Sequence, residues 1–201
     1  KLAAAFFLAA ATSMAAADPG RLVVIGDSIT QATAGATTQN GTRSYRWELF
    51  RRLHDAGLAF DFVGSHSRGY TTNDTQPDDA TNPYMPTHRG IPFDRAHEGH
   101  WSWRAFHVTG ESTGPTAGKR GSGDISIWTD PAKGGYRADT ATILLGINDI
   151  GESTPRTSTQ VTNDLAVIVR ALQTANPAVR VHLCELLHVA PGHAQHPAIN
   201  S

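Results

Sequence analysis

A buried strand that ends in a serine-containing turn is the feature of this sequence that most limits its possible folds. The apolar run Leu22–Ile25 leads directly into Gly26–Thr30, which reads Gly-Asp-Ser-Ile-Thr. Ligands bind at the carboxyl ends of strands in open α/β sheets. A serine there acts as a nucleophile when a base and an oxyanion site are supplied elsewhere in the fold. Because glycine, aspartate and serine are also common turn and cap residues, Ser28 is either a nucleophile or part of an ordinary turn.

A second apolar run has the same kind of ending. Thr140–Leu145 is followed by Gly146–Asp149, which reads Gly-Ile-Asn-Asp. Neighbouring parallel strands end at the same edge of a sheet, so we expect Asn148 to lie on the same edge as Ser28. An amide there can donate a hydrogen bond to a tetrahedral intermediate, which contributes about 10²- to 10³-fold in rate. Taken alone, Asn148 would be a helix cap or turn residue, but beside Ser28 it is predicted to be an oxyanion donor.

The alternation of strands and helices predicts the fold class. Apolar runs of strand length alternate with amphipathic stretches of helical period, which is typical of a parallel sheet with right-handed crossovers. The predicted strands are Leu22–Ile25, Phe60–Gly64, Thr140–Leu145 and Val179–Leu187, and the predicted helices are Tyr45–Ala56 and Thr159–Ala175. We therefore predict an α/β fold, a three-layer α/β/α sandwich, in one domain over residues 18–201.

Three blocks in this order resemble the SGNH/GDSL hydrolase family, and within it the secreted carbohydrate esterases of family three, which include acetyl xylan esterases. Gly26–Thr30 is similar to the first block, His97–Trp103 to the second and Gly146–Asp149 to the third. Two further stretches, Tyr45–Leu49 and Asp61–Ser65, agree with the carbohydrate esterase branch. The resemblance implies a flavodoxin-like sandwich and an ester hydrolase that needs no cofactor.

The resemblance also implies roles for individual residues. Ser28 would be the nucleophile and its backbone N–H one oxyanion donor, with the Asn148 amide as another. The family's second block usually has a glycine where this chain has Ser102. Serine keeps the N–H, so Ser102 is predicted to be the third donor, at a cost of about 1–2 kcal/mol if its φ must be positive. Alternatively Ser102 is an ordinary turn residue and Gly99 approaches the substrate.

Two residues are predicted to contact the substrate, Asp27 in the first block and Trp101 in the second. Aromatic faces commonly stack on sugar rings, which would favour a carbohydrate ester at Trp101. Trp103 and Phe106, at i, i+3 spacing, are instead predicted to pack a helix face against the core.

The family's last block, an Asp-x-x-His that supplies the general base and its orienting acid, is missing. Residues 188–201 contain no aspartate, and Asp94–His97, the single literal match to Asp-x-x-His, is interpreted as a coincidence. His188, His193 and His196 are alternative bases, although no carboxylate lies among residues 188–201 to orient them. We expect instead that the chain is a fragment, with the last strand and helix missing, and that these residues alone are inactive.

Composition excludes several other classes. The 201 residues carry a formal net charge of −1 without a basic run, which argues against nucleic-acid binding. The single cysteine, Cys184, precludes an internal disulfide and is predicted to be a core residue of its strand. The histidines show no convincing metal-binding spacing, so no metal is expected.

Residues 1–17 are predicted to be a cleaved secretory signal peptide. Lys1 precedes an alanine-rich apolar run, and Ala15–Ala17 satisfies the small-residue rule for cleavage. The alternative is a membrane anchor, but the run is short for a span of about 20 residues. We therefore expect a secreted or periplasmic monomer that is free of the membrane after cleavage.

The predicted function is a secreted serine esterase that removes acyl groups, expected to be acetyl, from a carbohydrate. A lipase or thioesterase would use the same chemistry, since specificity depends on variable loops. The alternative from another class is a non-catalytic carbohydrate-binding protein on a decayed hydrolase fold. The long polar segments Ser65–Pro92 and Gly110–Gly123 either shape the substrate cleft or are surface insertions.

Overall fold

The computed structural model describes residues 17–32, 44–65, 67, 69, 87–110, 123–151 and 155–186. Within these ranges the elements are β1 (Gly20–Gly26), α1 (Ser28–Gln31), α2 (Tyr45–Asp55), β2 (Phe60–Val63), β3 (Thr87–His88), β4 (Ile91–Pro92), β5 (Glu98–Gly99), α3 (Ala105–Val108), α5 (Ile125–Trp128), the 3₁₀ helix η1 (Pro131–Lys133), β6 (Thr140–Leu144), α6 (Ile147–Gly151), α7 (Ser158–Ala175) and β7 (Arg180–Leu183). The predicted signal peptide, apart from Ala17, lies outside the described residues, as do the three tail histidines.

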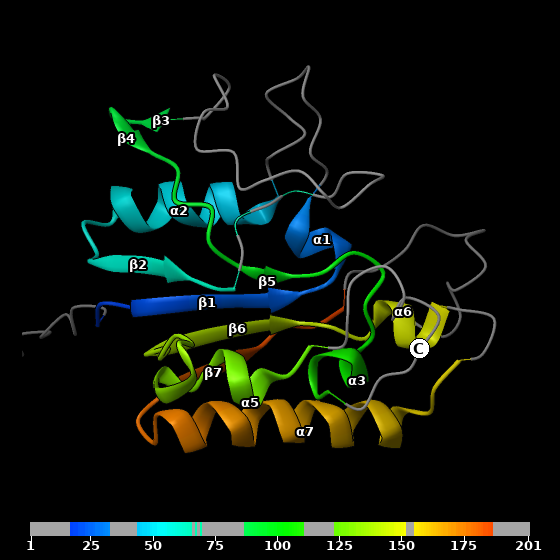
Figure 1. Cartoon of the computed structure of the whole chain (residues 1–201). Helices are drawn as coiled ribbons and strands as arrows, with labels where there is room; N and C mark the ends of the chain where they lie inside the picture. The colour runs from blue at the N-terminus through cyan, green and yellow to red at the C-terminus, as the bar shows by residue number, and fades with distance from the viewer. Residues whose placement is uncertain are drawn as a thin grey trace, which may run out of the picture.

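A parallel sheet forms the middle layer. Its strands run in the order β2-β1-β6-β7, and the short β5 pairs with the end of β1. Helix α2 covers one face, while α3, α5 and α7 lie on the other (Figure 1). This arrangement confirms the predicted α/β/α sandwich. Because Gly26 pairs with both Leu144 and Gly99, the ends of β1, β6 and β5 lie side by side.

Strand β1 divides its side chains between two cores, because successive residues of a strand point to opposite faces. Val23 and Ile25 pack in the core on the α7 side, which also contains Ile168. Leu22 and Val24 pack in the aromatic core under α2. Each fully buried aliphatic side chain of this kind contributes about 1.5–3 kcal/mol, so β1 is anchored on both faces just before the functional turn.

The two long helices lie close to their predicted limits, and local signals explain where they begin. Helix α2 is capped by Ser44, whose hydroxyl accepts from the Arg46 N–H. Helix α7 begins with a capping box between Thr157 and Gln160 and ends at Asn176. Both ends agree with the sequence prediction to within one residue.

The last predicted strand is shorter and more exposed than expected. We predict Val179–Leu187, but β7 covers Arg180–Leu183 only, and Leu183 is 58% exposed. The prediction that Cys184 belongs to the core is wrong, because Cys184 is exposed. Among the described residues β7 is an edge strand, so an apolar sequence there does not guarantee burial.

Part of the predicted polar segment Ser65–Pro92 forms a hairpin. Strands β3 and β4 are joined by Arg89 and Gly90, whose φ values of 52° and 79° suit a two-residue hairpin turn. His88 Nε2 lies 2.6 Å from Asp55 Oδ1, which ties the hairpin to the end of α2. Most of the remaining segment, and residues 111–122 of the second, lie outside the described residues. Across the described ranges, no helix is both long and apolar enough to cross a bilayer.

Candidate active site

Ser28 lies at the predicted position, at the first residue of α1 directly after β1. Asp27 caps this helix, since its Oδ1 accepts from the Ile29 N–H at 2.9 Å. The Ser28 side chain is partly exposed, and no described residue makes a hydrogen bond with its hydroxyl. The N–H of Ser28 belongs to the first turn of the helix, where amides have no intrahelical acceptor. Within the described part of the chain, nothing therefore competes for the Ser28 hydroxyl.

The second block passes directly over α1. The His100 N–H donates to the Gly26 carbonyl at 3.0 Å, and the Trp101 N–H donates to Gln31 Oε1 at 2.6 Å. A Cβ atom on Gly99 would lie 2.6 Å from the Gln31 nitrogen. Glycine is therefore required at position 99 for a close approach to α1. This packing does not favour the alternative in which Gly99 approaches the substrate.

Ser102 adopts a left-handed backbone conformation, the case in which its predicted role as an oxyanion donor carries a steric cost. Its φ is +60°, one of three positive values at non-glycine residues in the described part of the chain. The conformation costs an L-residue about 1–2 kcal/mol, and such strain concentrates at functional sites. Serine therefore occupies a glycine-like conformation here while retaining its backbone N–H.

Replacing Ser102 by glycine is expected to stabilise the protein by about 1 kcal/mol, because glycine adopts positive φ without the steric cost. The matched control is Ser158→Gly at the exposed start of α7, where glycine should lower stability. Urea unfolding monitored by circular dichroism measures both. A decrease in stability for Ser102→Gly would show that the serine side chain makes a favourable contact that outweighs the strain.

Asn148 lies on α6, immediately after β6, on the same edge of the sheet as Ser28. Its Nδ2 donates to the Trp103 carbonyl at 2.9 Å. A primary amide has two donor hydrogens, and this bond uses one of them. Trp103, one residue beyond Ser102, is 2% exposed and belongs to the core, as predicted. It precedes α3, however, and Phe106 is only partly buried, so the two residues do not form the predicted helix face.

Asp27 and Trp101, the predicted substrate contacts, lie in different surroundings. Asp27 is 1% exposed, and its Oδ2 has no hydrogen-bond partner among the described residues. Burial raises the pKa of Asp27 to about 6, partly offset by the Ile29 N–H. Trp101 is partly exposed at the surface of the second block. Substrate contact by either residue stays a prediction.

The second block contains a buried carboxyl group that is hydrogen-bonded to residues outside the block. Glu98 is fully buried, and its Oε1 accepts from the Ser65 N–H at 2.8 Å and from the Ser65 hydroxyl. Its Oε2 accepts from the Tyr136 hydroxyl at 3.2 Å. Burial raises the pKa of Glu98 to about 7, although these hydrogen bonds act in the opposite direction.

The raised pKa of Glu98 predicts a specific pH dependence of stability. Between its ordinary value of 4.5 and about 7, the folded protein binds more protons than the unfolded chain, so stability falls as pH rises through this window. In Glu98→Gln this fall should be smaller, because glutamine does not titrate. Urea unfolding at intervals from pH 4.5 to 8 measures it, with Glu48→Gln on the exposed face of α2 as the control. Equal slopes in wild type and Glu98→Gln would contradict the assignment.

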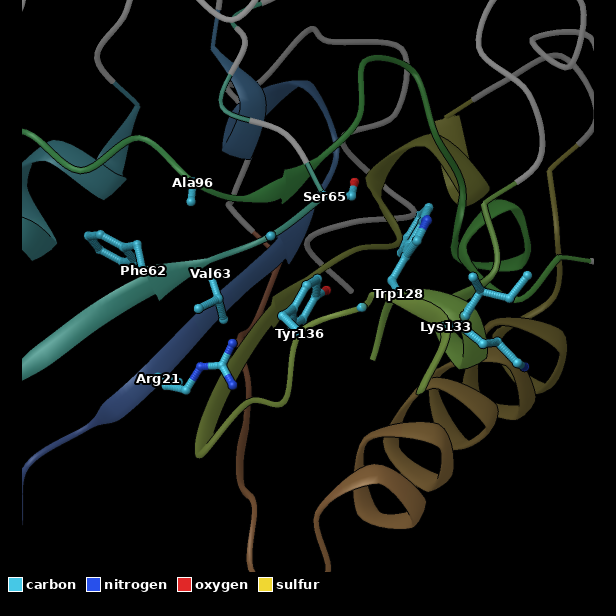
Figure 2. Close-up of a pocket in the computed structure, with 12 residues that line it drawn as sticks. Arg21, Phe62, Val63, Ser65, Ala96, Trp128, Lys133 and Tyr136 are labelled. Atoms are coloured by element: carbon cyan, nitrogen blue, oxygen red, sulfur yellow. The ribbon is translucent and has the colours of Figure 1, made fainter. Parts of the chain in front are cut away.

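A cavity of about 560 Å³ lies beside the hydrogen-bond partners of Glu98, between β2 and the segment that follows α5 (Figure 2). Its lining includes Ser65, Tyr136 and Trp128. The Trp128 ring also stacks on the His100 ring, with 5.1 Å between the two ring centres. Ser28, Ser102 and Asn148 are not among the lining residues.

Two residues of the coincidental Asp-x-x-His match have structural partners. The carboxylate of Asp94 accepts from the N–H groups of Phe62 and Ala96. His97 is fully buried, and its Nδ1 accepts from the Gly99 N–H at 2.8 Å. These contacts agree with the interpretation that this pair is not the catalytic acid and base.

Arg46 is a supporting residue that local sequence patterns do not single out. It is 2% exposed, and its guanidinium donates to the carbonyls of Thr30 and Arg95, both at 2.8 Å. It thus connects α1 with the segment that leads into the second block. The sequence signals were its place within Tyr45–Leu49, the stretch that agrees with the carbohydrate esterase branch, and its position between two aromatic residues.

Comparison with known proteins identifies the fold. A carbohydrate esterase family 3 structure from Talaromyces cellulolyticus matches with 23% identity and a TM-score of 0.60, over 90% of this chain and 69% of that chain. An acetyl esterase mutant with an acetate ion matches with 23% identity and a TM-score of 0.58 over the same shares. A family 3 carbohydrate esterase from Clostridium thermocellum matches with 24% identity and a TM-score of 0.51, over 89% of this chain and 67% of that chain. No protein-family model and no curated protein sequence matches. The similarity confirms the predicted fold and the predicted structural resemblance to family 3 carbohydrate esterases.

Proposed function

We propose that this protein is a serine esterase that removes acyl groups, and specifically acetyl groups, from carbohydrates. The observation that carries the proposal is the grouping of three elements at one sheet edge. They are Ser28 at the start of α1, the left-handed Ser102 in the second block and Asn148 on α6. The fold shared with carbohydrate esterase structures supports it.

In the proposed reaction, the Ser28 Oγ attacks the carbonyl carbon of the ester and loses its proton to a general base. The N–H groups of Ser28 and Ser102 and the Asn148 amide donate to the resulting oxyanion. Collapse of the intermediate breaks the ester C–O bond, and the base returns the proton to the leaving alcohol. A water molecule, deprotonated by the same base, then attacks the acyl-serine and releases the carboxylic acid and free Ser28.

The general base is expected to be a histidine oriented by an aspartate. In the described ranges no histidine makes a hydrogen bond with the Ser28 hydroxyl, so we propose that this pair comes from residues outside them. Trp101 is proposed to stack on a sugar ring beside the ester, and Asp27 to act at the same edge. Export by the amino-terminal segment remains part of the proposal, as does a monomeric state.

The proposal is tested with the protein expressed from its complete coding sequence. Acetate release from acetylated xylan, together with hydrolysis of p-nitrophenyl acetate, should be far above background. A non-catalytic carbohydrate-binding protein would instead bind xylan without releasing acetate. That outcome would exclude the esterase and favour the alternative.

A further inference from the structure

Arg156 joins three helices next to the candidate oxyanion site. Its Nη2 lies 2.7 Å from Asp164 Oδ2 on α7, and its Nε lies 3.8 Å from Asp149 Oδ1 on α6. Its guanidinium carbon lies 4.4 Å from the centre of the Phe106 ring on α3. The Arg156 N–H also donates to the Asp149 carbonyl at 2.8 Å. Side chain and backbone therefore both attach Arg156 to the end of α6.

Helix α6 in turn holds the segment that follows Ser102 through two consecutive side chains. Asn148 donates to the Trp103 carbonyl at 2.9 Å, and Asp149 Oδ2 accepts from the Ala105 N–H at 3.0 Å. The first bond holds the segment by a backbone carbonyl, and the second holds it by a backbone N–H. The two candidate donors Ser102 and Asn148 thus belong to one hydrogen-bonded unit.

Charge and burial make this unit dependent on Arg156. Asp149 is fully buried and Asp164 is 7% exposed, and buried carboxylates need an opposite charge or several donors. Arg156 forms ion pairs with both of them, and Arg104 adds a second positive charge near Asp149. Its side chain is itself only 18% exposed. Loss of the Arg156 charge would remove the one ion pair that links the two carboxylates and would weaken the hold on the Ala105 N–H.

We infer that Arg156 is a positioning residue for the oxyanion site: through Asp149 it fixes α6, and so sets the distance between the Asn148 amide and the Ser102 N–H. The inference rests on the proposed function, because it concerns the geometry of that same site. Oxyanion donors stabilise the transition state more than the bound substrate. A misplaced donor should therefore lower kcat and leave KM nearly unchanged.

The test compares Arg156→Met with Arg156→Lys in the protein expressed from its complete coding sequence. Methionine keeps an apolar contact with Phe106 but has no charge, and we expect kcat to fall about 10- to 100-fold with KM within twofold. Lysine restores the charge and should recover part of kcat. Arg170→Met, exposed on α7, should behave as wild type, and Ile168→Val in the core shows what destabilisation alone does to kcat.

Hydrogen exchange gives a second readout that does not depend on turnover. In Arg156→Met the Ala105 amide should exchange faster, while amides in β1 stay protected. Unchanged exchange at Ala105, or a kcat equal to that of Ile168→Val, would overturn the inference. Absence of esterase activity in the wild type would instead contradict the proposed function, and the exchange experiment would still decide whether Arg156 holds the unit together.

Discussion

Ser28→Ala is expected to abolish ester hydrolysis, with a decrease in kcat on the order of 10⁶-fold, the loss seen when a serine hydrolase lacks its nucleophile. The fold should be retained, because no described residue bonds to the Ser28 hydroxyl, and such substitutions usually change stability by less than about 0.5 kcal/mol. Initial rates on p-nitrophenyl acetate and acetylated xylan measure the effect, with thermal unfolding as the check on folding.

The matched control is Ser158→Ala at the exposed start of α7. It removes the same hydroxyl from an exposed position that is not one of the predicted site residues, and it should leave the rate unchanged. If Ser28→Ala retained wild-type activity, Ser28 would be a cap residue and the nucleophile would have to be sought elsewhere.

Asn148→Ala is expected to lower kcat by about 10²- to 10³-fold, the usual effect of removing one oxyanion donor. KM should change little, since the donor acts mainly in the transition state. The mutation also leaves the partly buried Trp103 carbonyl without this partner, which should cost about 1 kcal/mol of stability. Rates must therefore be compared well below the melting temperature of the mutant.

Asn148→Asp separates the electrostatic effect from the steric one. Aspartate has nearly the same shape, but at neutral pH it has no donor and its charge would repel an oxyanion. We expect kcat to be lower than in Asn148→Ala. An aspartate variant more active than the alanine variant would contradict the assignment of Asn148 as a donor.

The parts of the fold that sequence patterns predict are those with strong local signals. The capped, amphipathic α7 agrees with its prediction to within one residue, and the apolar run Leu22–Ile25 marks the centre of β1, which extends two residues before it and one after it. The placement of Ser28 and Asn148 on one edge also followed, because parallel strands end together. The resemblance places a glycine at position 102, so a positive φ at Ser102 was considered but not predicted outright. The structure has a positive φ there.

The contacts that support the site could not be predicted in the same way. The hydrogen bonds between Glu98 and Tyr136 and between Asn148 and Trp103 join residues about 40 positions apart in the sequence. The periodicity of apolar residues does not indicate such long-range pairs. The short β5 has no strand-like pattern because only two residues pair. Cys184 was predicted wrongly for a related reason: apolar character does not say whether a strand lies at an edge.

The measurement that most directly tests the account is the reaction of the protein, expressed from its complete coding sequence, with a fluorophosphonate ester. This reagent phosphonylates activated serine nucleophiles, and intact-mass and peptide analysis locate the adduct. The account predicts one adduct per chain, on the peptide that contains Ser28, and none in Ser28→Ala. An adduct on another residue, or no adduct in an enzyme that hydrolyses acetyl esters, would contradict the assignment of Ser28 as the nucleophile.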